Sequence, residues 1–386
     1  MDIETNRAAL EAWLILLRAP GLGAASLREL LATHGDVGAA LVAARRGDHP
    51  RARDRDCRAW LRAPDAARIE SDLAWLAQPT HVLLTCDGAD FPALLDEAPG
   101  APAALFVAGD STALWQPQVA IVGSRNASQG GCANADAFAR ALAMAGFAVT
   151  SGLAEGIDTA AHGGALAAGA ATLAVLGTGP DRVYPSRQGP LSARIAAQGA
   201  LVSEFPPGTP AHEKHFPRRN RVIAGLSLGT LVVEAGARSG ALITARNATE
   251  AGREVFAIPG SIHNPLARGC HQLIRQGAKL IETADEIITE LVPLAQRLGA
   301  NLRERLDEPA DSPAPSARGA ASARTTDPDY ARLYRALGHD TLGVDQLAER
   351  SGLPVASLAS MLLMLELEGE VVAERGGYAR RTGASG

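Results

Sequence analysis

Lysine is almost absent from this chain of 386 residues, whose 37 basic side chains include only Lys214 and Lys279 as lysines. Neither lysine follows a glycine, so the sequence has no phosphate-binding loop of the pattern G-x-x-x-x-G-K-[ST]. Positive charge is not in excess either, because the formal net charge is −5. These absences exclude a P-loop nucleoside triphosphatase and a protein that attracts polyanions over its whole surface.

Cysteine is scarce as well: four residues occur, and no two of them form a C-x-x-C pair. This spacing argues against a cysteine zinc site and a redox motif, and we predict no metal and no cofactor. Scattered cysteines without a signal peptide indicate a reducing cytosol, so we expect a cytoplasmic protein. The first apolar stretch is interrupted by Arg18 and Pro20 and is too short to span a bilayer, so no membrane role is expected.

Hydrophobic residues make up 47% of the chain and charged residues 20%, so it can bury a core, and its length suggests two or three domains. Residues 1–75 predict a helical domain, because Leu10, Trp13 and Leu14 recur at helical spacing. The turn Pro20–Gly23 joins two helices and could present backbone N–H groups to a phosphate. Eleven arginines and eleven acidic residues in this region cancel, which favours a plain helical hairpin.

Residues 76–298 alternate short apolar runs with helical stretches. Near-continuous apolar strands separated by helices predict an α/β fold with a doubly wound, mostly parallel sheet. Such sheets bind ligands at the carboxyl ends of their strands, near the point where the strand order reverses. The predicted strands are 119–122, 148–150, 172–176, 200–203, 230–233 and 255–258, and the predicted helices are 129–145, 158–168, 191–197, 242–251 and 269–276.

The C-terminal part divides into a linker and a small domain. Residues 299–328 are predicted as a flexible linker, because 307–328 hold four prolines and no apolar side chain larger than alanine. Residues 329–386 predict helices followed by a hairpin at 370–379, the order of a winged helix. The helix expected near 354–368 carries Glu366 and Glu368 and no basic residue, which favours structural or protein contacts over reading of a major groove.

Charge is unevenly distributed within the α/β region. Residues 211–280 contain ten basic and four acidic residues, a net charge of +6 in a chain whose total is −5. A basic patch on an acidic body predicts a local anionic ligand. The alternative is a set of solvated arginines, which fits the tight cluster from Lys214 to Arg221 poorly.

Glycine-containing turns follow several of the predicted strands. Gly123, Ser124 and Arg125 lead from a strand into a helix, where free N–H groups and a guanidinium fork suit a phosphate. A second turn contains Gly152 and ends at Asp158, which is placed to be a helix N-cap. Further turns are Gly177–Gly179 and the helix start formed by Arg238, Ser239 and Gly240. Several such turns in one domain predict a phosphate-bearing ligand.

A proline-rich stretch at 204–221 reads as a long loop that combines aromatic and basic side chains. Single-stranded nucleic acid requires this combination, because a base stacks on a ring while cations hold the backbone. Phe216 would be the stacking platform, or alternatively a core residue. The candidate binding residues in this stretch are Lys214, Phe216, Arg218, Arg219, Asn220 and Arg221.

Other ligand classes and catalysis have little support. The turn at Gly177 has Arg182 in place of the third glycine of a dinucleotide fingerprint, which disfavours NAD. The histidines have no metal-ligand spacing, and no G-x-S-x-G elbow occurs. Glu234 and Asp158 could act as acid and base, but Asp158 also fits a cap and Glu234 a pair with a nearby arginine. We therefore predict no catalytic residues.

Collinear motifs over residues 75–290 resemble those of the DprA/Smf family of DNA-processing proteins. The motifs are IVGSRNAS, SGLAEGIDTAAH, VLGTGPDRVYP, SEFPPGTPAHEKHFPRRNRVIAGLS, VVEAGARSGALITARNATEAGREVFAIPG and NPLARGCHQLIRQGA. The resemblance implies an extended Rossmann domain over 76–298, with a SAM-like domain over 1–75 and a winged helix over 329–386. One departure is Cys270-His271, where many relatives have a small residue and Asn, which puts any polar contact from this turn in doubt.

The resemblance also implies a function. Proteins of this family bind single-stranded DNA without sequence preference, form homodimers through the Rossmann domain and load the RecA recombinase onto incoming DNA during natural transformation. Gly123, Ser124, Arg125 and Lys214 would hold phosphate, together with the run Arg218–Arg221, and Ser239 and Gly240 would frame the same pocket. Proteins of this family are not known for turnover of a small substrate.

Two other functions remain open at this stage. A nucleotide-processing enzyme similar to phosphoribohydrolases would use Glu234, which follows Gly229-Thr230 in a loose echo of those enzymes. A transcription factor would use the winged helix, although the acidic helix near 354–368 argues against it.

Overall fold

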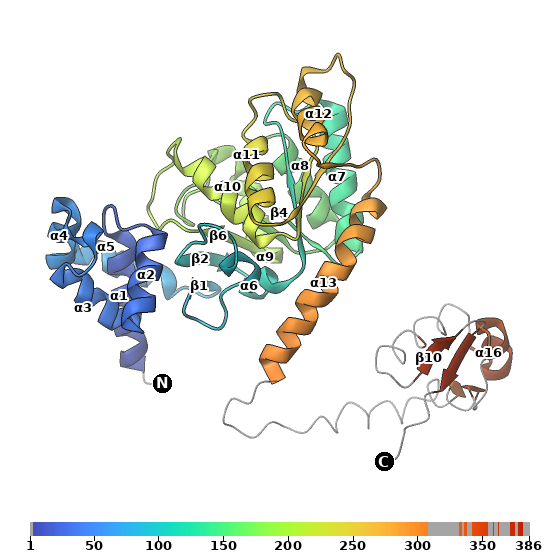
Figure 1. Cartoon of the computed structure of the whole chain (residues 1–386), viewed down its shortest axis with the longest axis horizontal. Coiled ribbons are helices and arrows are strands. Elements are labelled where there is room, and N and C mark those ends of the chain that lie inside the picture. Colours follow the sequence, from blue (N-terminus) through green and yellow to red (C-terminus); the bar gives the residue numbers. More distant parts are fainter. Residues whose placement is uncertain are drawn as a thin grey trace. The chain divides into compact units, whose positions relative to one another are not determined.

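The computed structural model describes residues 3–307 and, beyond them, 332–333, 336–337, 342–353, 358, 362, 371–374 and 377–380. The chain forms two compact units, Met1–Arg305 and Leu306–Gly386 (Figure 1). The larger unit contains both the helical region and the α/β region. The helical residues Trp13 and Leu16 share one apolar cluster with Phe106 and Leu201 of the α/β region, so the two regions pack on a common core.

Residues 3–76 form a helical region, as the spacing of the leucines predicted. Two helices flank the turn at Pro20–Gly23, and their apolar faces bury Leu14 and Leu27. Asp36 and Asp65 cap the third and fifth helices by accepting backbone N–H groups. The helices are α1 (Ile3–Arg18), α2 (Ala24–His34), α3 (Val37–Arg46), α4 (Arg55–Arg62) and α5 (Ala66–Leu76), with a 3₁₀ turn at Pro50–Arg53.

A nine-stranded sheet forms the centre of the larger unit, and its order is β1-β2-β6-β5-β4-β3-β7-β8-β9. The seven strands from β6 to β9 in this order are parallel, and β1 and β2 add an antiparallel edge beside β6. The prediction of a mostly parallel sheet is therefore confirmed, although the antiparallel edge was missed. The strands are β1 (His81–Thr85), β2 (Ala104–Gly109), β3 (Gln118–Val122), β4 (Ala148–Ser151), β5 (Thr172–Val175), β6 (Ala200–Ser203), β7 (Gly229–Val232), β8 (Glu254–Ala257) and β9 (Lys279–Leu280).

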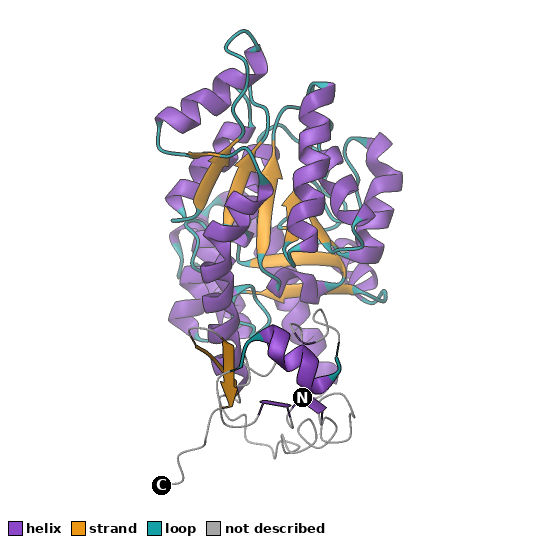
Figure 2. Cartoon of the chain, turned by 90° about the vertical axis from the view of Figure 1, so that its right-hand side faces the viewer, coloured by secondary structure: helices purple, strands orange, loops and turns teal. Residues whose placement is uncertain are grey.

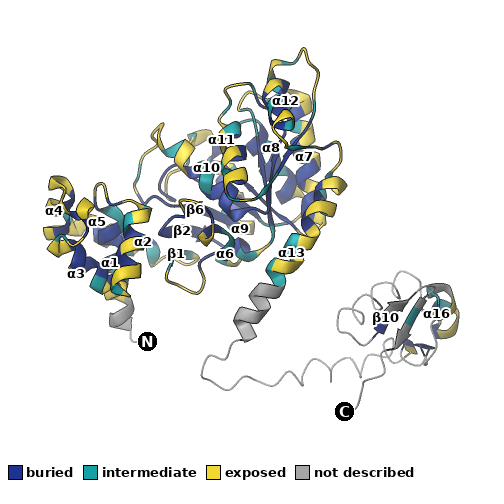
Figure 3. Ribbon diagram, viewed as in Figure 1, coloured by how far each residue is buried: buried dark blue, intermediate teal, exposed yellow. Residues whose placement is uncertain are grey.

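Helices cover both faces of this sheet, shown in orange in Figure 2. Neighbouring residues of a strand point to opposite faces, so Val122 packs with α10, α11 and α12, whereas Ile121 packs with α7, α8 and α13. Figure 3 shows the strands and the inward faces of these helices as buried. The helices are α6 (Ala93–Asp96), α7 (Gln129–Met144), α8 (Ile157–Ala167), α9 (Gly189–Gln198), α10 (His215–Leu226), α11 (Ala241–Glu250), α12 (Arg268–Arg275) and α13 (Ala284–Asp307), with 3₁₀ turns at Ser111–Trp115, Ser186–Gln188 and Pro265–Ala267.

The strand order reverses between β3 and β7. From β3 the chain continues through β4, β5 and β6 on one side, and then returns to place β7 on the other side of β3. Loops that leave the carboxyl ends of two such strands diverge to opposite faces, which opens a crevice between them. The turns after Val122 and after Val232 therefore border one crevice.

The stretch 204–221 was predicted as one long loop, but only its first half is a loop. Its second half forms the first turns of α10, which begins at His215 and places Phe216 and Arg219 on a helix. Pro217 lies in the first helical turn, where the missing N–H has no intrahelical partner to lose. Proline there is compatible with a helix start, and reading it as a loop residue was wrong.

The smaller unit contains α16 (Val344–Ser351) and a hairpin of β10 (Val371–Glu374) and β11 (Gly377–Arg380). The hairpin predicted at 370–379 is confirmed. The helix expected near 354–368 lies outside the described residues except for Leu358 and Leu362, which are helical and buried. In the larger unit, α13 extends to Asp307, so the first residues of the predicted linker are helical, and the rest of it lies outside the described residues.

Candidate functional site

A cleft of about 730 Å³ opens at the carboxyl ends of β3 and β7. The sequence predicts a ligand at this crevice, and the turns after both strands line it. Nine of the predicted site residues lie on its walls: Gly123, Ser124, Arg125, Phe216, Arg219, Asn220, Arg238, Ser239 and Gly240. Gly152 lies on a neighbouring cavity, and Lys214, Arg218 and Arg221 line neither one.

Two exposed arginines of the cleft are free to bind a ligand. Arg125 and Arg238 have no hydrogen-bond or ion-pair partner in the part of the chain that the structure describes. The Arg125 guanidinium lies 5.5 Å from the ring centroid of Phe216, within the range of a cation–π contact. Phe216 is half-buried, so its ring is a wall of the cleft and not a core residue.

Arg219, by contrast, is only 5% exposed. Its Nη1 donates to the carbonyl oxygen of Gly152 at 2.6 Å and to that of Val175. Burial lowers the pKa of Arg219 to about 10, while the nearby Asp158 carboxylate acts in the opposite direction. Its guanidinium therefore joins α10 to the ends of β4 and β5, and its role as a phosphate contact stays a prediction.

Asp158 was predicted to cap α8, but it lies buried in the first turn of that helix and is not its N-cap. The N-cap is Gly156, and the Asp158 carboxylate accepts from the backbone N–H groups of Gly152, at 3.0 Å, and Ala154, at 3.2 Å. Burial raises the pKa of Asp158, whereas Arg219 and these two donors lower it. The carboxylate thus folds the loop after β4 back onto the helix that follows.

Close packing inside the protein surrounds two glycines of the predicted site. A Cβ atom on Gly123 would lie 2.5 Å from the side chain of Ile157 and 2.9 Å from the Glu234 carbonyl oxygen. A Cβ on Gly152 would lie 2.6 Å from the Arg219 guanidinium. The backbone contact at Gly123 excludes any larger residue, whereas a side chain at Gly152 would displace the Arg219 guanidinium from its bonds.

Hydroxyl and amide side chains order the two loops of the cleft. The Ser124 hydroxyl accepts from the N–H of Asn126 at 3.2 Å, and the Ser239 hydroxyl accepts from the N–H of Ala241 at 3.3 Å. Asn220 donates to the carbonyl oxygen of Gly240 at 3.3 Å, which ties α10 to the start of α11. The bonds of Ser239 and Asn220 hold the start of α11 at the rim of the cleft, where its backbone dipole favours an anion.

The other basic residues of the stretch 214–221 do not line the cleft. Arg218 and Arg221 both pair with Glu204, the first at 3.0 Å from its Nε, and the Glu204 side chain is only 3% exposed. Burial lowers the pKa of Arg221, and the attraction of Glu204 opposes that shift. Lys214 is exposed just before α10, and its ammonium has no partner among the described residues.

Glu234 was expected to pair with a nearby arginine, and this expectation is wrong. Its two carboxylate oxygens accept from the Ser128 hydroxyl, at 2.7 Å, and from the Ser128 backbone N–H, at 2.9 Å. The glutamate therefore anchors the N-cap of α7 from the end of β7. In the described part of the chain, no group of three or more His, Cys, Asp and Glu side chains could hold a metal ion, and no helix is long and apolar enough to cross a membrane.

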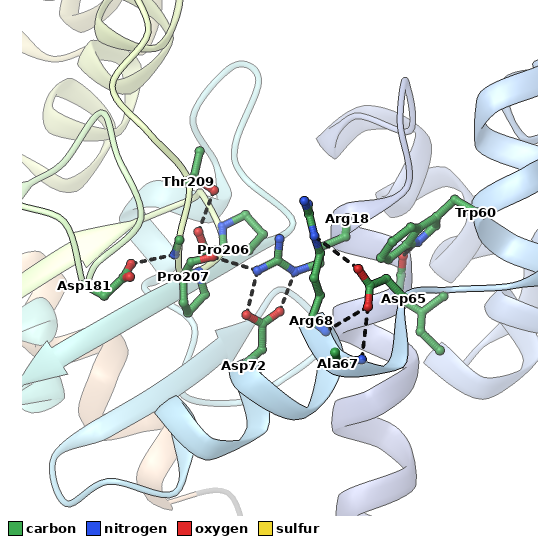
Figure 4. A network of polar contacts seen from close by, with 12 residues as sticks. Arg18, Trp60, Asp65, Ala67, Arg68, Asp72, Asp181, Pro206, Pro207 and Thr209 are labelled. Atoms are coloured by element: carbon green, nitrogen blue, oxygen red, sulfur yellow. Dashed lines mark hydrogen bonds and ion pairs between the residues drawn. The ribbon is translucent and has the colours of Figure 1, made fainter.

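The helical region reaches the loop that leads into α10 (Figure 4). Arg18 of α1 forms a two-pronged ion pair with Asp72 of α5, at 2.5 and 2.6 Å, and Asp72 is 1% exposed. The same guanidinium donates to the carbonyl oxygen of Pro207 at 2.7 Å. The next residue, Gly208, donates its N–H to Asp181 at 2.7 Å. This chain of contacts positions the loop 204–214, and no local sequence pattern could have indicated it.

Sequence reasoning also missed several residues of the site. Tyr184, Asn126 and Glu213 line the cleft but were not among the predicted residues. Tyr184 lies in the quoted motif VLGTGPDRVYP, where an aromatic side chain among glycines and prolines was the available signal. His271 does not line the cleft, and its Nε2 lies 2.9 Å from the Gly260 carbonyl oxygen.

A mostly parallel sheet, with a cleft at its switch point that is lined by two exposed arginines, defines an extended Rossmann-like fold. The family model of the DNA recombination-mediator protein A matches residues 82–292, and that of the DprA winged helix domain matches residues 313–377. The chain belongs to the DprA/Smf family.

Individual relatives agree with this assignment. Protein Smf of Escherichia coli K12 is 44% identical over 313 residues, which cover 81% of this chain and 80% of that protein. The X-ray structure of DNA processing protein A from Streptococcus pneumoniae is similar with a TM-score of 0.65 at 36% identity, over 72% of this chain and 97% of that one. A structure of the Helicobacter pylori protein, which concerns its single-stranded DNA binding mode, gives a TM-score of 0.50 at 26% identity, over 55% of this chain and 96% of that one.

Proposed function

We propose that this protein binds single-stranded DNA without sequence preference in the cleft between β3 and β7. The observation that carries the proposal is that two unpaired arginines, Arg125 and Arg238, and the half-buried ring of Phe216 line one cleft. The single-stranded DNA binding described for the Helicobacter pylori relative supports the same ligand.

The division of labour in the cleft follows from its chemistry. Guanidinium groups bind phosphate oxygens with charge-assisted hydrogen bonds, and the start of α11 adds a favourable dipole. A base that stacks on Phe216 presents only its flat face, which all four bases share. Affinity therefore comes from the backbone and from stacking, and neither depends on sequence.

We further propose that the bound strand is handed to the RecA recombinase during natural transformation, and that the protein acts as a homodimer through its Rossmann domain. The family to which the chain belongs is that of a DNA recombination mediator, which supports a role in delivering DNA to a recombinase. The sequence contains no P-loop, so the ATP used in strand exchange would be hydrolysed by the recombinase. In this role the protein turns over no small substrate.

The direct test compares fluorescence anisotropy of labelled oligo-dT with that of a duplex of equal length, over a range of salt concentrations. We expect tight binding of oligo-dT, weaker binding of the duplex, and an affinity that falls steeply with salt because phosphate contacts release counterions. Equal affinity for both ligands, or affinity that is independent of salt, would contradict the proposal. RecA loading is tested by the rate of strand exchange with and without the protein.

A nucleotide-processing enzyme is the alternative. Such an enzyme would need Glu234 as a catalytic group, but both oxygens of this carboxylate hold Ser128. We therefore expect no release of free base from nucleoside monophosphates. Release by the wild-type protein that is lost in Glu234→Gln would favour the enzyme instead.

A further inference from the structure

A second cavity, of about 420 Å³, opens beside the cleft. Both are lined by a shared set of residues: Arg125, Ala154, Tyr184, Phe216 and Arg219. The volume of the second cavity lies within the range of about 300–1,000 Å³ that is typical of small-molecule sites. A ligand in the cleft can therefore extend into this cavity past the two aromatic rings.

The two cavities differ in the groups that they offer. Beyond the shared residues, the cleft contains the unpaired Arg238 and two serine hydroxyls, which suit phosphate. The second cavity instead contains Pro185, Gly152 and the ion pair of Glu155 with Arg187. Because that arginine is already neutralised, the second cavity adds flat apolar surface and a polar edge without adding net charge.

Tyr184 provides a large, exposed aromatic ring in the wall of the second cavity. The residue is 50% exposed, and its ring centroid lies 5.5 Å from that of Phe216 at an interplanar angle of 36°. The ring thus contacts Phe216, while half of the residue remains exposed. An exposed aromatic ring beside a cavity is a stacking surface for a nucleobase.

The ion pair provides the edge chemistry that a stacked base needs. The Glu155 carboxylate accepts hydrogen bonds, and the Arg187 guanidinium has further N–H donors beyond the one bound to Glu155. The Watson–Crick edge of every base carries donors and acceptors, which are occupied by the partner base in a duplex. A pocket that holds this edge accepts only an unpaired base.

We propose that the cavity between Tyr184 and Arg187 receives one unpaired base of a strand whose phosphates lie in the cleft, and that Tyr184 is its stacking wall. The cavity thereby contributes to the preference for single-stranded over double-stranded DNA. This inference rests on the proposed function, because it requires a strand in the cleft.

The test uses Tyr184→Ala and Tyr184→Phe with two labelled probes of equal length, oligo-dT and an oligonucleotide of abasic sites. Loss of one stacking interaction predicts that Tyr184→Ala binds oligo-dT about tenfold to hundredfold more weakly, and Tyr184→Phe within about twofold of wild type. On the abasic probe, all three proteins are expected to bind equally. Met144→Ala is the control, because Met144 is an exposed apolar residue at the end of α7, away from both cavities.

Unchanged oligo-dT binding by Tyr184→Ala, or an equal loss on both probes, would overturn the base pocket while leaving the proposed function intact. Failure of the proposed function looks different, because wild-type protein would then not bind oligo-dT with salt dependence. If Tyr184→Ala proves unstable, Tyr184→Trp reports directly. Its added fluorescence should be quenched by oligo-dT and not by the abasic probe, and equal quenching by both would also refute the pocket.

Discussion

Two groups of basic residues lie within one domain, and their surroundings differ. Arg125, Lys214 and Arg238 are exposed and have no carboxylate partner among the described residues, and we call them the open cations. Arg218 and Arg221 hold Glu204 and are the bound cations. The net charge of +6 over 211–280 therefore overstates what a ligand meets there, because carboxylates from outside that segment neutralise part of it.

Arg219 forms a third case between these groups. Its charge is buried against two carbonyl oxygens, with Asp158 close by. It points toward the interior of the site and supports the loop after β4. The three arginines of the run Arg218–Arg221 thus point in two directions. Arg218 and Arg221 are about one helical turn apart and both face Glu204, whereas Arg219 lies about 100° around the helix from Arg218.

The strongest test of the comparison removes two open cations together. The double variant Arg125→Ala, Arg238→Ala should weaken oligo-dT binding by at least about hundredfold, since a hydrogen bond to a charged group contributes about 1.5–3 kcal/mol. The slope of log affinity against log salt should become shallower by about 1.4, or about 0.7 for each phosphate that is no longer neutralised. Arg246→Ala is the matched control, because Arg246 is exposed on α11 but does not line the cleft. An equally large effect of Arg246→Ala would show that the arginines of the cleft do not differ from other exposed arginines.

The bound cations are tested through stability. Glu204→Gln leaves the partly buried Arg221 without a counter-charge and should lower the free energy of unfolding by about 2 kcal/mol, less than the loss for a fully buried pair. Oligo-dT affinity should change by less than about threefold, because neither Arg218 nor Arg221 lines the cleft. Urea unfolding and anisotropy measure the two quantities. A large change of affinity with unaltered stability would show that Arg218 and Arg221 act on the ligand and not on the fold.

A buried ring near Arg219 gives a prediction about pH. The His162 ring is 0% exposed, and its Nδ1 lies 2.7 Å from the Thr172 hydroxyl, which itself donates to the Val149 carbonyl oxygen. Burial, and secondly the charge of Arg219, lower the pKa of His162 from 6.5 to about 3. Protonation therefore favours the unfolded state as the pH falls below 6.5.

The stability conferred by neutral His162 is complete above pH 6.5 and is lost progressively toward pH 3. We expect unfolding at pH 5.5 to require about 1.4 kcal/mol less than at pH 7.5 from this residue alone. The measurement is urea unfolding at both pH values for wild type and His162→Gln, in which this part of the pH dependence should vanish. An identical pH slope in the variant would show that other groups cause it.

The smallest effect is expected at Lys214. This open cation lies before α10 and outside the lining of the cleft, so Lys214→Ala should weaken oligo-dT binding only about threefold to fivefold. The salt slope should change by about 0.7 if its ammonium binds one phosphate. Anisotropy titrations decide this, with Lys279→Ala as the control, since Lys279 pairs with Glu254 at 3.0 Å. A reduction as large as that of the double variant would extend the site along the loop 204–214.

Much of the fold could be read from the chain because its signals are local. Buried parallel strands such as 119–122 are continuous apolar runs, and each is found within a residue or so of its predicted bounds. The strands at the antiparallel edge were missed, because β1 is only partly buried and its pairing with β2 joins residues 19 to 27 positions apart. The parallel edge strand β9 was missed as well, because it has only two residues. The helix α10 was missed because Pro217 and its arginines were read as loop signals.

Apolar periodicity and strand-end turns were enough to predict six parallel strands, the crevice and nine of the residues that line it, because these signals involve only neighbouring residues. Which charges remain available to a ligand depends on contacts that form when the chain folds. Whether an arginine is open or bound depends on carboxylates such as Glu204 and Asp158, which are distant in the chain or on another element. The same holds for Arg18, which reaches Pro207 across 189 positions. The two lysines illustrate this difference, because Lys279 is held by Glu254 and Glu290 whereas Lys214 stays open.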